Sequence, residues 1–246
     1  MTIYLLTFLV VLVSSLLSGM SGGGGGFIMT PYFLLMGLTP QQNVAVGSVI
    51  GLGLSGGSLF AARGKGVVDR AVVLPLLLLA ILSTAVSVYA LPKLHADVSS
   101  KLVGWFVLFA VPTLFINKSH LPAVGNMSRA RLVLGYALYA LLWFANGVFS
   151  AGFAALLFVP MLLCLGLSAV EANIAKRYGA LAQALVLFAT LAPRGLIVWN
   201  YAAASLIGAW LGGQLGTHLA IRNGERFARL ALASVMVVSG SLLLLR

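Results

Sequence analysis

The residues whose types could do chemistry gather around a run of five glycines, Gly22 to Gly26, inside apolar sequence. Glycine disfavours a helix interior by roughly 1 kcal/mol relative to alanine, so the run predicts a helix break at membrane depth. Backbone groups freed by such a break must lie within protein or line a polar cavity, because lipid offers them no hydrogen bonds. The apolar helix expected after the break would point its free N–H groups back at the glycines, which favours anion binding. The alternative is a flexible turn between two membrane helices.

A second break rich in small residues, from Ser150 to Gly152, precedes two cations, Lys176 and Arg177, that lie inside an apolar segment. A cation at membrane depth is costly and usually has a functional role or a partner. Both side chains are also long enough to extend to the cytoplasmic interface, and Glu171 could pair with either. Anion binding and extension to the interface therefore stay open for both cations.

Neutral polar residues near the two breaks complete the candidate site. They can coordinate an oxyanion, or they can form hydrogen bonds between helices, worth about 0.6–2 kcal/mol each in membranes. Gln183 is one such residue near the breaks. The predicted substrate-binding residues are Ser21, Gly22, Gly23, Gly24, Gly25, Gly26, Asn43, Ser48, Asn146, Ser150, Gly152, Asn173, Lys176 and Arg177.

The elements that must position these residues are membrane helices. The chain has 246 residues, of which 61% are hydrophobic and 8% charged, and its mean hydropathy is +1.09. This composition predicts an all-α polytopic membrane protein and excludes a soluble domain. Residues 2–20 lack a basic start and a cleavage motif, so we expect the first membrane segment there rather than a removed signal. The ten apolar segments are 3–20, 27–38, 43–62, 71–91, 102–116, 132–149, 153–167, 172–191, 196–220 and 227–245.

The two halves of the chain form an internal repeat. Placing Pro31 on Pro160 also aligns Ser21 with Ser150, and it brings further glycines into register. Five segments per repeat reverse the orientation of the second half, so we expect two inverted five-segment repeats with broken or short helices. The short segments 27–38 and 153–167 stand in matching positions, which points to the binding site. The expected organisation is a first repeat over 1–117, a cytoplasmic linker over 118–131 and a second repeat over 132–246.

The net charge of +11 is expected to mark cytoplasmic loops rather than nucleic-acid binding. Ten crossings gather nine of the basic residues on one side and place both termini outside. If each broken pair were one crossing, this asymmetry would nearly vanish. A re-entrant hairpin at each break has the same parity as ten crossings and stays open. The nine residues are Arg63, Lys65, Arg70, Lys118, Arg129, Arg131, Arg222, Arg226 and Arg229.

Other motifs have structural explanations. The G-x-G-x-x-G match at 51–56 lies within a membrane segment, where a dinucleotide-binding βαβ unit cannot form. Small residues at four-residue spacing instead predict close helix packing, at Gly47, Gly51 and Ser55 and again at Gly208, Gly212 and Gly216. The sequence carries no hydrolase or metal-site signature, so we expect neither an enzyme nor a cofactor.

The chain resembles the sulfite exporter TauE/SafE family along nearly its whole length. The resemblance rests on S-G-M-S-G-G-G-G-G-F-I-M-T-P-Y-F-L-L-M-G-L from Ser18, N-V-A-V-G-S from Asn43 and R-G-K-G-V-V-D from Arg63. In the second half it rests on F-A-N-G-V-F-S-A-G from Phe144 and A-N-I-A-K from Ala172. It implies a multi-pass transporter of the bacterial inner membrane for sulfite, organosulfonates or related small anions, usually an exporter.

Three functions are compared on this basis. The first is a secondary transporter of a small anion, in which one repeat rocks against the other to give alternating access. The second is an anion channel on the same scaffold, with the breaks as its filter. The third is an intramembrane enzyme or assembly factor, which the missing nucleophile–base set disfavours. The lipid bilayer is an expected partner of each, and the oligomeric state stays open, a homo-oligomer included.

Overall fold

The computed structural model describes residues 2–23, 25–65, 68–90, 111, 128–149 and 153–244. All regular structure in these ranges is helical, as the composition predicts. Of these helices, three are long and apolar enough to cross a membrane by themselves, at Ile3–Ser21, Gln41–Ala62 and Ala71–Tyr89. The described helices are α1 (Thr2–Ser21), α2 (Gly26–Leu35), α3 (Pro40–Ala62), α4 (Arg70–Ala90), α6 (Arg129–Phe149), α7 (Phe153–Leu156), α8 (Phe158–Leu163), α9 (Ala169–Leu191) and α10 (Trp199–Leu244).

The helices follow the predicted apolar segments closely. The fifth segment, 102–116, lies outside the described residues except for Val111. The segment predicted over 153–167 is two short helices, α7 and α8, rather than one. The ninth and tenth segments run on as α10, but Gly224 interrupts it with φ 78° and ψ −168°, so its two parts are separate helices joined by a kink.

Both broken helix pairs fold back on themselves. In the first, the Tyr32 hydroxyl lies 2.7 Å from the Thr7 Oγ1, and Gly25 lies beside Ser14, so α2 runs antiparallel to α1. In the second, the Arg131 Nε at the start of α6 donates to the Leu163 carbonyl at the end of α8, 3.1 Å away. This fold-back excludes the alternative in which each broken pair forms one straight crossing.

The two short helices end in the same way. Gly37 after α2 and Gly166 after α8 both have positive φ, 83° and 66°, a conformation that glycine adopts at no steric cost. The helices that follow, α3 and α9, each begin with a capping box, Thr39 with Gln42 and Ser168 with Glu171. These are the positions that the sequence repeat aligns, so the aligned residues build the same local structure twice.

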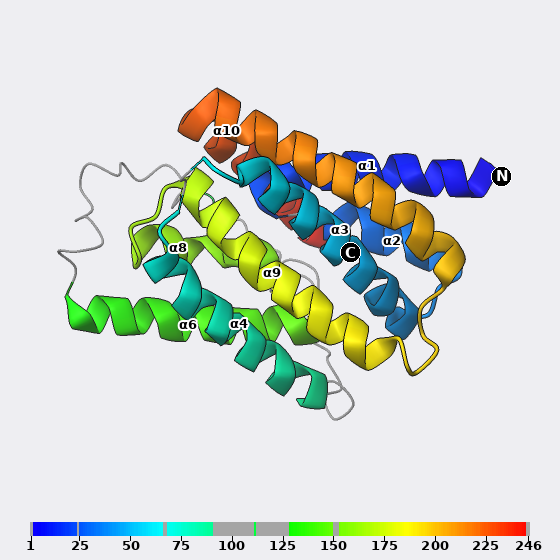
Figure 1. Cartoon of the computed structure of the whole chain (residues 1–246), viewed down its shortest axis with the longest axis horizontal. Helices are drawn as coiled ribbons and strands as arrows, with labels where there is room; N and C mark the ends of the chain where they lie inside the picture. The colour runs from blue at the N-terminus through cyan, green and yellow to red at the C-terminus, as the bar shows by residue number, and fades with distance from the viewer. Residues whose placement is uncertain are drawn as a thin grey trace.

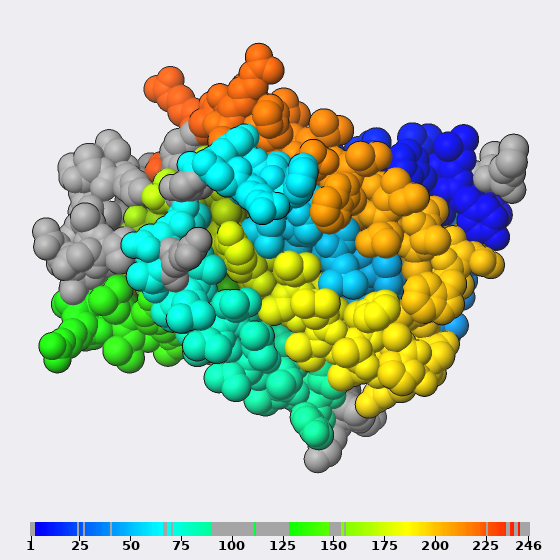
Figure 2. Space-filling model, viewed as in Figure 1, coloured from blue at the N-terminus to red at the C-terminus, as the bar shows by residue number. Residues whose placement is uncertain are grey.

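The helices pack as two bundles, and each bundle contains helices from both halves of the sequence (Figure 1). The α1 bundle contains α1, α2, α3 and the first part of α10. The α9 bundle contains α4, α6, α7, α8 and α9, and Leu232, beyond the α10 kink, joins its core. The bundles meet mainly along α3 and α9, where Gly51 packs against the Ala184 Cβ. Figure 2 shows α9 between α4 and α10 on one face of the molecule.

Glycines allow the closest helix contacts, as their four-residue spacing predicts. A Cβ on Gly208 would lie 2.8 Å from the Phe8 carbonyl oxygen, and Gly212 and Gly216 lie at least as close to α1. The prediction for Gly51 is confirmed by its contact with α9. It is wrong for Gly47, because no atom lies within 4 Å of a Cβ placed there.

Apolar side chains are exposed and polar side chains are buried, the reverse of the distribution in a soluble protein. Leu74, Leu78 and Leu82 form an exposed apolar stripe along α4. Polar and charged side chains such as Thr84 and Lys176 are buried between helices. This distribution fits a protein that faces lipid on its outside.

The basic loops gather at one end of the molecule, on the left of Figure 1. There α3 ends, α4 and α6 begin, and the α10 kink lies. Arg63, Arg129 and Arg222 belong to these helix ends, whereas Arg194 lies between α9 and α10 at the opposite end. The basic residues of the described loops therefore segregate along the helix axes as positive-inside counting requires.

Candidate functional site

Gly22 ends α1. It has φ 76°, and its N–H donates to the Ser18 carbonyl, 2.7 Å away. A left-handed glycine is a common end to an α-helix, because it costs no Cβ clash. The last carbonyls of such a helix have no partner within it and carry the negative end of the helix dipole. Within the membrane these carbonyls need donors from elsewhere in the protein.

The donors come from the first turns of α9, on one face of that helix. Asn173, Lys176 and Arg177 have the i, i+3, i+4 spacing that places side chains together. All three are buried, with exposed fractions of 2%, 5% and 3%. Their bonds run from Asn173 Nδ2 to the carbonyls of Gly19 (2.8 Å) and Met20 (3.3 Å), from Lys176 Nζ to that of Gly22 (2.6 Å), and from Arg177 Nη2 to the carbonyl and the hydroxyl of Ser18.

Lys176 also joins the first break to the second. Its Nζ donates to the Ala154 carbonyl at 2.5 Å, just after the break at 150–152, and lies 5.1 Å from the centre of the Phe158 ring. A Cβ on Gly23 would lie 3.3 Å from the same nitrogen and 3.6 Å from the Ala154 oxygen. The end of α1 and the start of α7 therefore meet around one buried ammonium group. We name this set of contacts the latch: Asn173, Lys176 and Arg177 with the α1 carbonyls and Ala154.

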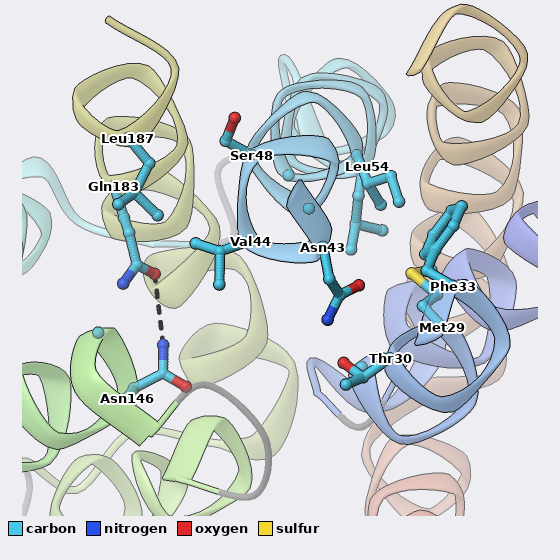
Figure 3. Close-up of a pocket in the computed structure, with 15 residues that line it drawn as sticks. Met29, Thr30, Phe33, Asn43, Val44, Ser48, Leu54, Asn146, Gln183 and Leu187 are labelled. Carbon is cyan, nitrogen blue, oxygen red and sulfur yellow. Dashed lines mark hydrogen bonds between the residues drawn. The ribbon is translucent and has the colours of Figure 1, made fainter. Parts of the chain in front are cut away.

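A cavity of about 230 Å³ lies between α2, α3, α6 and α9, and so between the two bundles (Figure 3). Polar groups face it from both sides. Thr30 and Asn43 come from the α1 bundle, and Asn146 donates to the Gln183 Oε1 at 3.3 Å in the α9 bundle. The lining residues are Gly26, Met29, Thr30, Phe33, Asn43, Val44, Gly47, Ser48, Ile50, Gly51, Leu54, Asn146, Gly147, Gln183 and Leu187.

The cavity and the latch lie at different depths along α9. The latch side chains occupy its first turns, at the basic end of the molecule, and Gln183 and Leu187 lie further toward the opposite end. The glycine loop, the run from Gly22 to Gly26, links the latch and the cavity along the chain, since Gly22 and Gly23 contact the latch and Gly26 lines the cavity. The lining named above is neutral, with amides and hydroxyls that can hydrogen-bond a small polar solute among apolar side chains.

The predicted site residues fall into these two groups. Those lining the cavity are Gly26, Asn43, Ser48 and Asn146, and those at the latch are Gly22, Gly23, Asn173, Lys176 and Arg177. The Ser21 hydroxyl instead donates to the carbonyls of Leu17 and Gly23 at the end of α1. Gly25 packs against α1. Gly24, Ser150 and Gly152 lie outside the described residues.

Sequence reasoning gave no role to Thr30, and it named Gln183 as a neutral polar residue near the breaks without including it among the predicted substrate-binding residues. Thr30 precedes Pro31 in the short helix, and that position is the signal that could have found it. Gln183 lies two turns beyond Lys176 on the same helix. The Ser48 hydroxyl donates to the Ala45 carbonyl at 2.7 Å and points away from Asn43 in Figure 3.

Comparison with known proteins identifies the family. The sequence model of the family described as sulfite exporter TauE/SafE matches residues 6–243. The chain belongs to the sulfite exporter TauE/SafE family. This membership makes the chain a membrane transporter, and the apolar outer surface of its helices fits that environment.

Two curated relatives are similar to this TauE/SafE protein over most of their length. One, described as a probable membrane transporter protein ORF9 from Sinorhizobium sp, is 24% identical over 87% of this chain and 82% of its own. The other, a probable membrane transporter protein from Haemophilus influenzae, is 23% identical over 90% of this chain and 87% of its own. No solved structure gives a significant match.

Proposed function

We propose that this protein is a secondary transporter that exports a small anion, such as sulfite or an organosulfonate, across the bacterial inner membrane. The observation that carries the proposal is the cavity between the two bundles, which lies further along α9 than the point where the end of α1 meets α7. Its polar residues come from both bundles, so a solute held there contacts two bodies that can move relative to each other. This is the position of the substrate site in transporters built from broken helices.

The arrangement of the breaks supports inverted repeats over 1–117 and 132–246. Because α2 returns alongside α1 and α8 returns alongside α6, each short helix goes back toward the end from which its partner started. In Figure 1, α1 starts at the end opposite the basic loops and α6 starts at the basic end. We take the basic end as cytoplasmic, so the cavity belongs to the outer half of the protein.

The exchange of helices between sequence halves changes the expected motion. The sequence suggests that one repeat rocks against the other. Because α4 packs with α6 and α9, and α10 packs with α1 and α3, we propose that the two bundles are the moving bodies. Their interface contains the cavity, the latch and the contact of Gly51 with Ala184.

Purified protein in liposomes tests the proposal. Vesicles loaded with unlabelled sulfite should take up labelled sulfite faster than empty vesicles, because a transporter exchanges its substrate. Substitution of Asn43 or Asn146 by Ala should lower this exchange by about tenfold or more, the effect of a hydrogen bond to a charged ligand. Asn200→Ala, a matched change at an exposed site on α10, should leave it unchanged.

Two results would overturn the proposal. Uptake that is equal with and without internal sulfite would indicate an anion channel on the same scaffold. Absence of uptake for sulfite, sulfate, thiosulfate, taurine and sulfoacetate alike would exclude anion transport of this class.

A further inference from the structure

Three side chains of α9 make polar contacts that join the two bundles at the basic end. Lys176 bonds to Gly22 of the α1 bundle and to Ala154 of its own bundle. Asn173 and Arg177 bond to the end of α1. Any separation of the bundles at this end must break these bonds. If the bundles separate reversibly, Lys176 and Arg177 need new hydrogen-bond partners, because an unpaired charge in a membrane interior is very costly.

We propose that Lys176 is an anion-exchange latch: the transported anion displaces the Gly22 carbonyl from its ammonium group and thereby releases the contact between the bundles. The inference rests on the proposed function and extends it, since it assigns the opening step to the substrate itself. In this proposal Lys176 bonds to the Gly22 carbonyl when the bundles are in contact and to the anion when they are apart.

The chemistry of the present partners favours the exchange. Both described acceptors of the ammonium are uncharged carbonyls, at 2.6 Å and 2.5 Å. The carbonyls supply hydrogen bonds but no opposite charge, and an anion would add a direct Coulomb attraction to the ammonium, which is strong in a low-dielectric interior. Arg177, the next residue, adds a second buried positive charge on the same face. The carbonyls therefore hold the ammonium without matching its charge.

Arg177 has donor capacity in reserve. Its Nε is buried and has no hydrogen-bond partner among the described residues. A buried donor without a partner is unfavourable, so a ligand that accepts from it removes that penalty. An oxyanion at the latch has several acceptor oxygens, so it can accept from Lys176 Nζ through one oxygen and from Arg177 Nε through another.

The glycine loop provides the route. Gly26 lines the cavity and has open space where a Cβ would lie, and Gly23 sits against the Lys176 nitrogen. Glycine accepts backbone conformations closed to other residues, so Gly22 and Gly23 can change conformation when their contacts with the latch break. In this proposal the glycine loop allows the two bundles to separate at the latch, and it does not form a fixed binding site for the anion.

Disulfide trapping across the latch tests the proposal. Cysteines at Gly23 and Ala154, in a Cys164→Ser background, report how closely the two breaks approach. Methanesulfonate is the probe, because sulfite cleaves disulfides, and dimethyl sulfone is its uncharged counterpart. Methanesulfonate should slow cross-linking by about threefold or more through a shift in population, and dimethyl sulfone should not.

The Lys176→Met substitution provides the decisive comparison. With it, methanesulfonate should have no effect on the cross-linking rate. An equal rate with and without methanesulfonate in the Lys176 protein, or an effect that persists after Lys176→Met, overturns the latch. Flux of methanesulfonate measured in the same vesicles distinguishes the latch from the proposed transport function. Flux without a change in the cross-linking rate contradicts only the latch. A change in the cross-linking rate without flux of any anion contradicts only the transport function.

A second measurement uses the unsubstituted chain and does not depend on the folding of the cysteine variant. Methanesulfonate should speed hydrogen–deuterium exchange of the amides at residues 18–26, because the end of α1 loses its donors. The same amides in the Lys176→Met protein should exchange at one rate with and without the anion. Unchanged exchange in the unsubstituted protein contradicts the latch.

Discussion

Replacing Gly22 by Ala tests whether the first break has the geometry described. Gly22 has φ 76°, in the left-handed region that costs an L-residue roughly 1–2 kcal/mol. An added methyl group would also lie 2.9 Å from the Asn173 Oδ1 and closer still to the Phe158 ring. Either neighbour must shift, and such overpacking typically costs about 1–3 kcal/mol. We therefore expect Gly22→Ala to destabilise the protein by roughly 2–5 kcal/mol.

The same glycine run contains a matched control. A Cβ on Gly26 meets no atom within 4 Å, and Gly26 is the first residue of α2. Alanine favours a helix over glycine by about 1 kcal/mol, so Gly26→Ala should leave stability unchanged or raise it slightly. One methyl group thus has opposite expected effects at two positions four residues apart.

Thermal unfolding of the purified variants in detergent, followed by size exclusion after heating, measures the difference. At this chain length 1 kcal/mol corresponds to about 2–4 °C in Tm, so Gly22→Ala should lower Tm by about 4 °C or more. Equal Tm values for the two variants would refute the assigned conformation of Gly22 and its contact with Asn173.

Three further predictions address packing and topology. Gly208→Leu should force α10 away from α1 and lower stability by about 1–3 kcal/mol in the same thermal assay, whereas Gly208→Ala should cost less. A cysteine replacing Arg226 should react with an impermeant maleimide only from the cytoplasmic side, and one replacing Arg194 only from outside; the reverse pattern contradicts the topology. Trp143→Phe removes the 3.2 Å bond from the indole to Thr84 and should cost about 1 kcal/mol, and an unchanged Tm would contradict that bond.

Local sequence signals predicted most of the helices. The apolar runs located α1, α3 and α4, and the repeat aligned the residues that end the two short helices, Gly37 and Gly166. These features depend on residues near in sequence, such as the capping boxes. The split of 153–167 into α7 and α8 was not predicted, because the sequence there is apolar throughout.

The packing of the bundles could not be read from the repeat. A sequence repeat indicates similar units, but it does not say which helices of each unit pack together. Here α10 lies against α1 and α4 lies against α9, so each half contributes helices to both bundles. The glycine spacing at Gly208 predicted a close helix contact without identifying α1 as the partner.

The candidate site was predicted in its residue types and not in its arrangement. The sequence grouped Asn43 and Lys176 in a single site, because both lie near breaks. The structure separates them, since Asn43 lines the cavity and Lys176 bonds to backbone carbonyls. Sequence cannot reveal that the end of α1 supplies acceptors for a buried cation, because those acceptors are backbone groups. That Lys176 meets an anion stays a prediction.

The central claim is that a small anion crosses the protein through the cavity between the bundles. Gly47 lines this cavity and has open space for a larger side chain. The most direct test is sulfite exchange by Gly47→Cys in a Cys164→Ser background, before and after N-ethylmaleimide, whose thioether sulfite does not cleave. We expect exchange before modification and its loss afterwards, with no loss in the Cys164→Ser protein treated in the same way. Full exchange after complete modification of the cysteine at position 47 would contradict it.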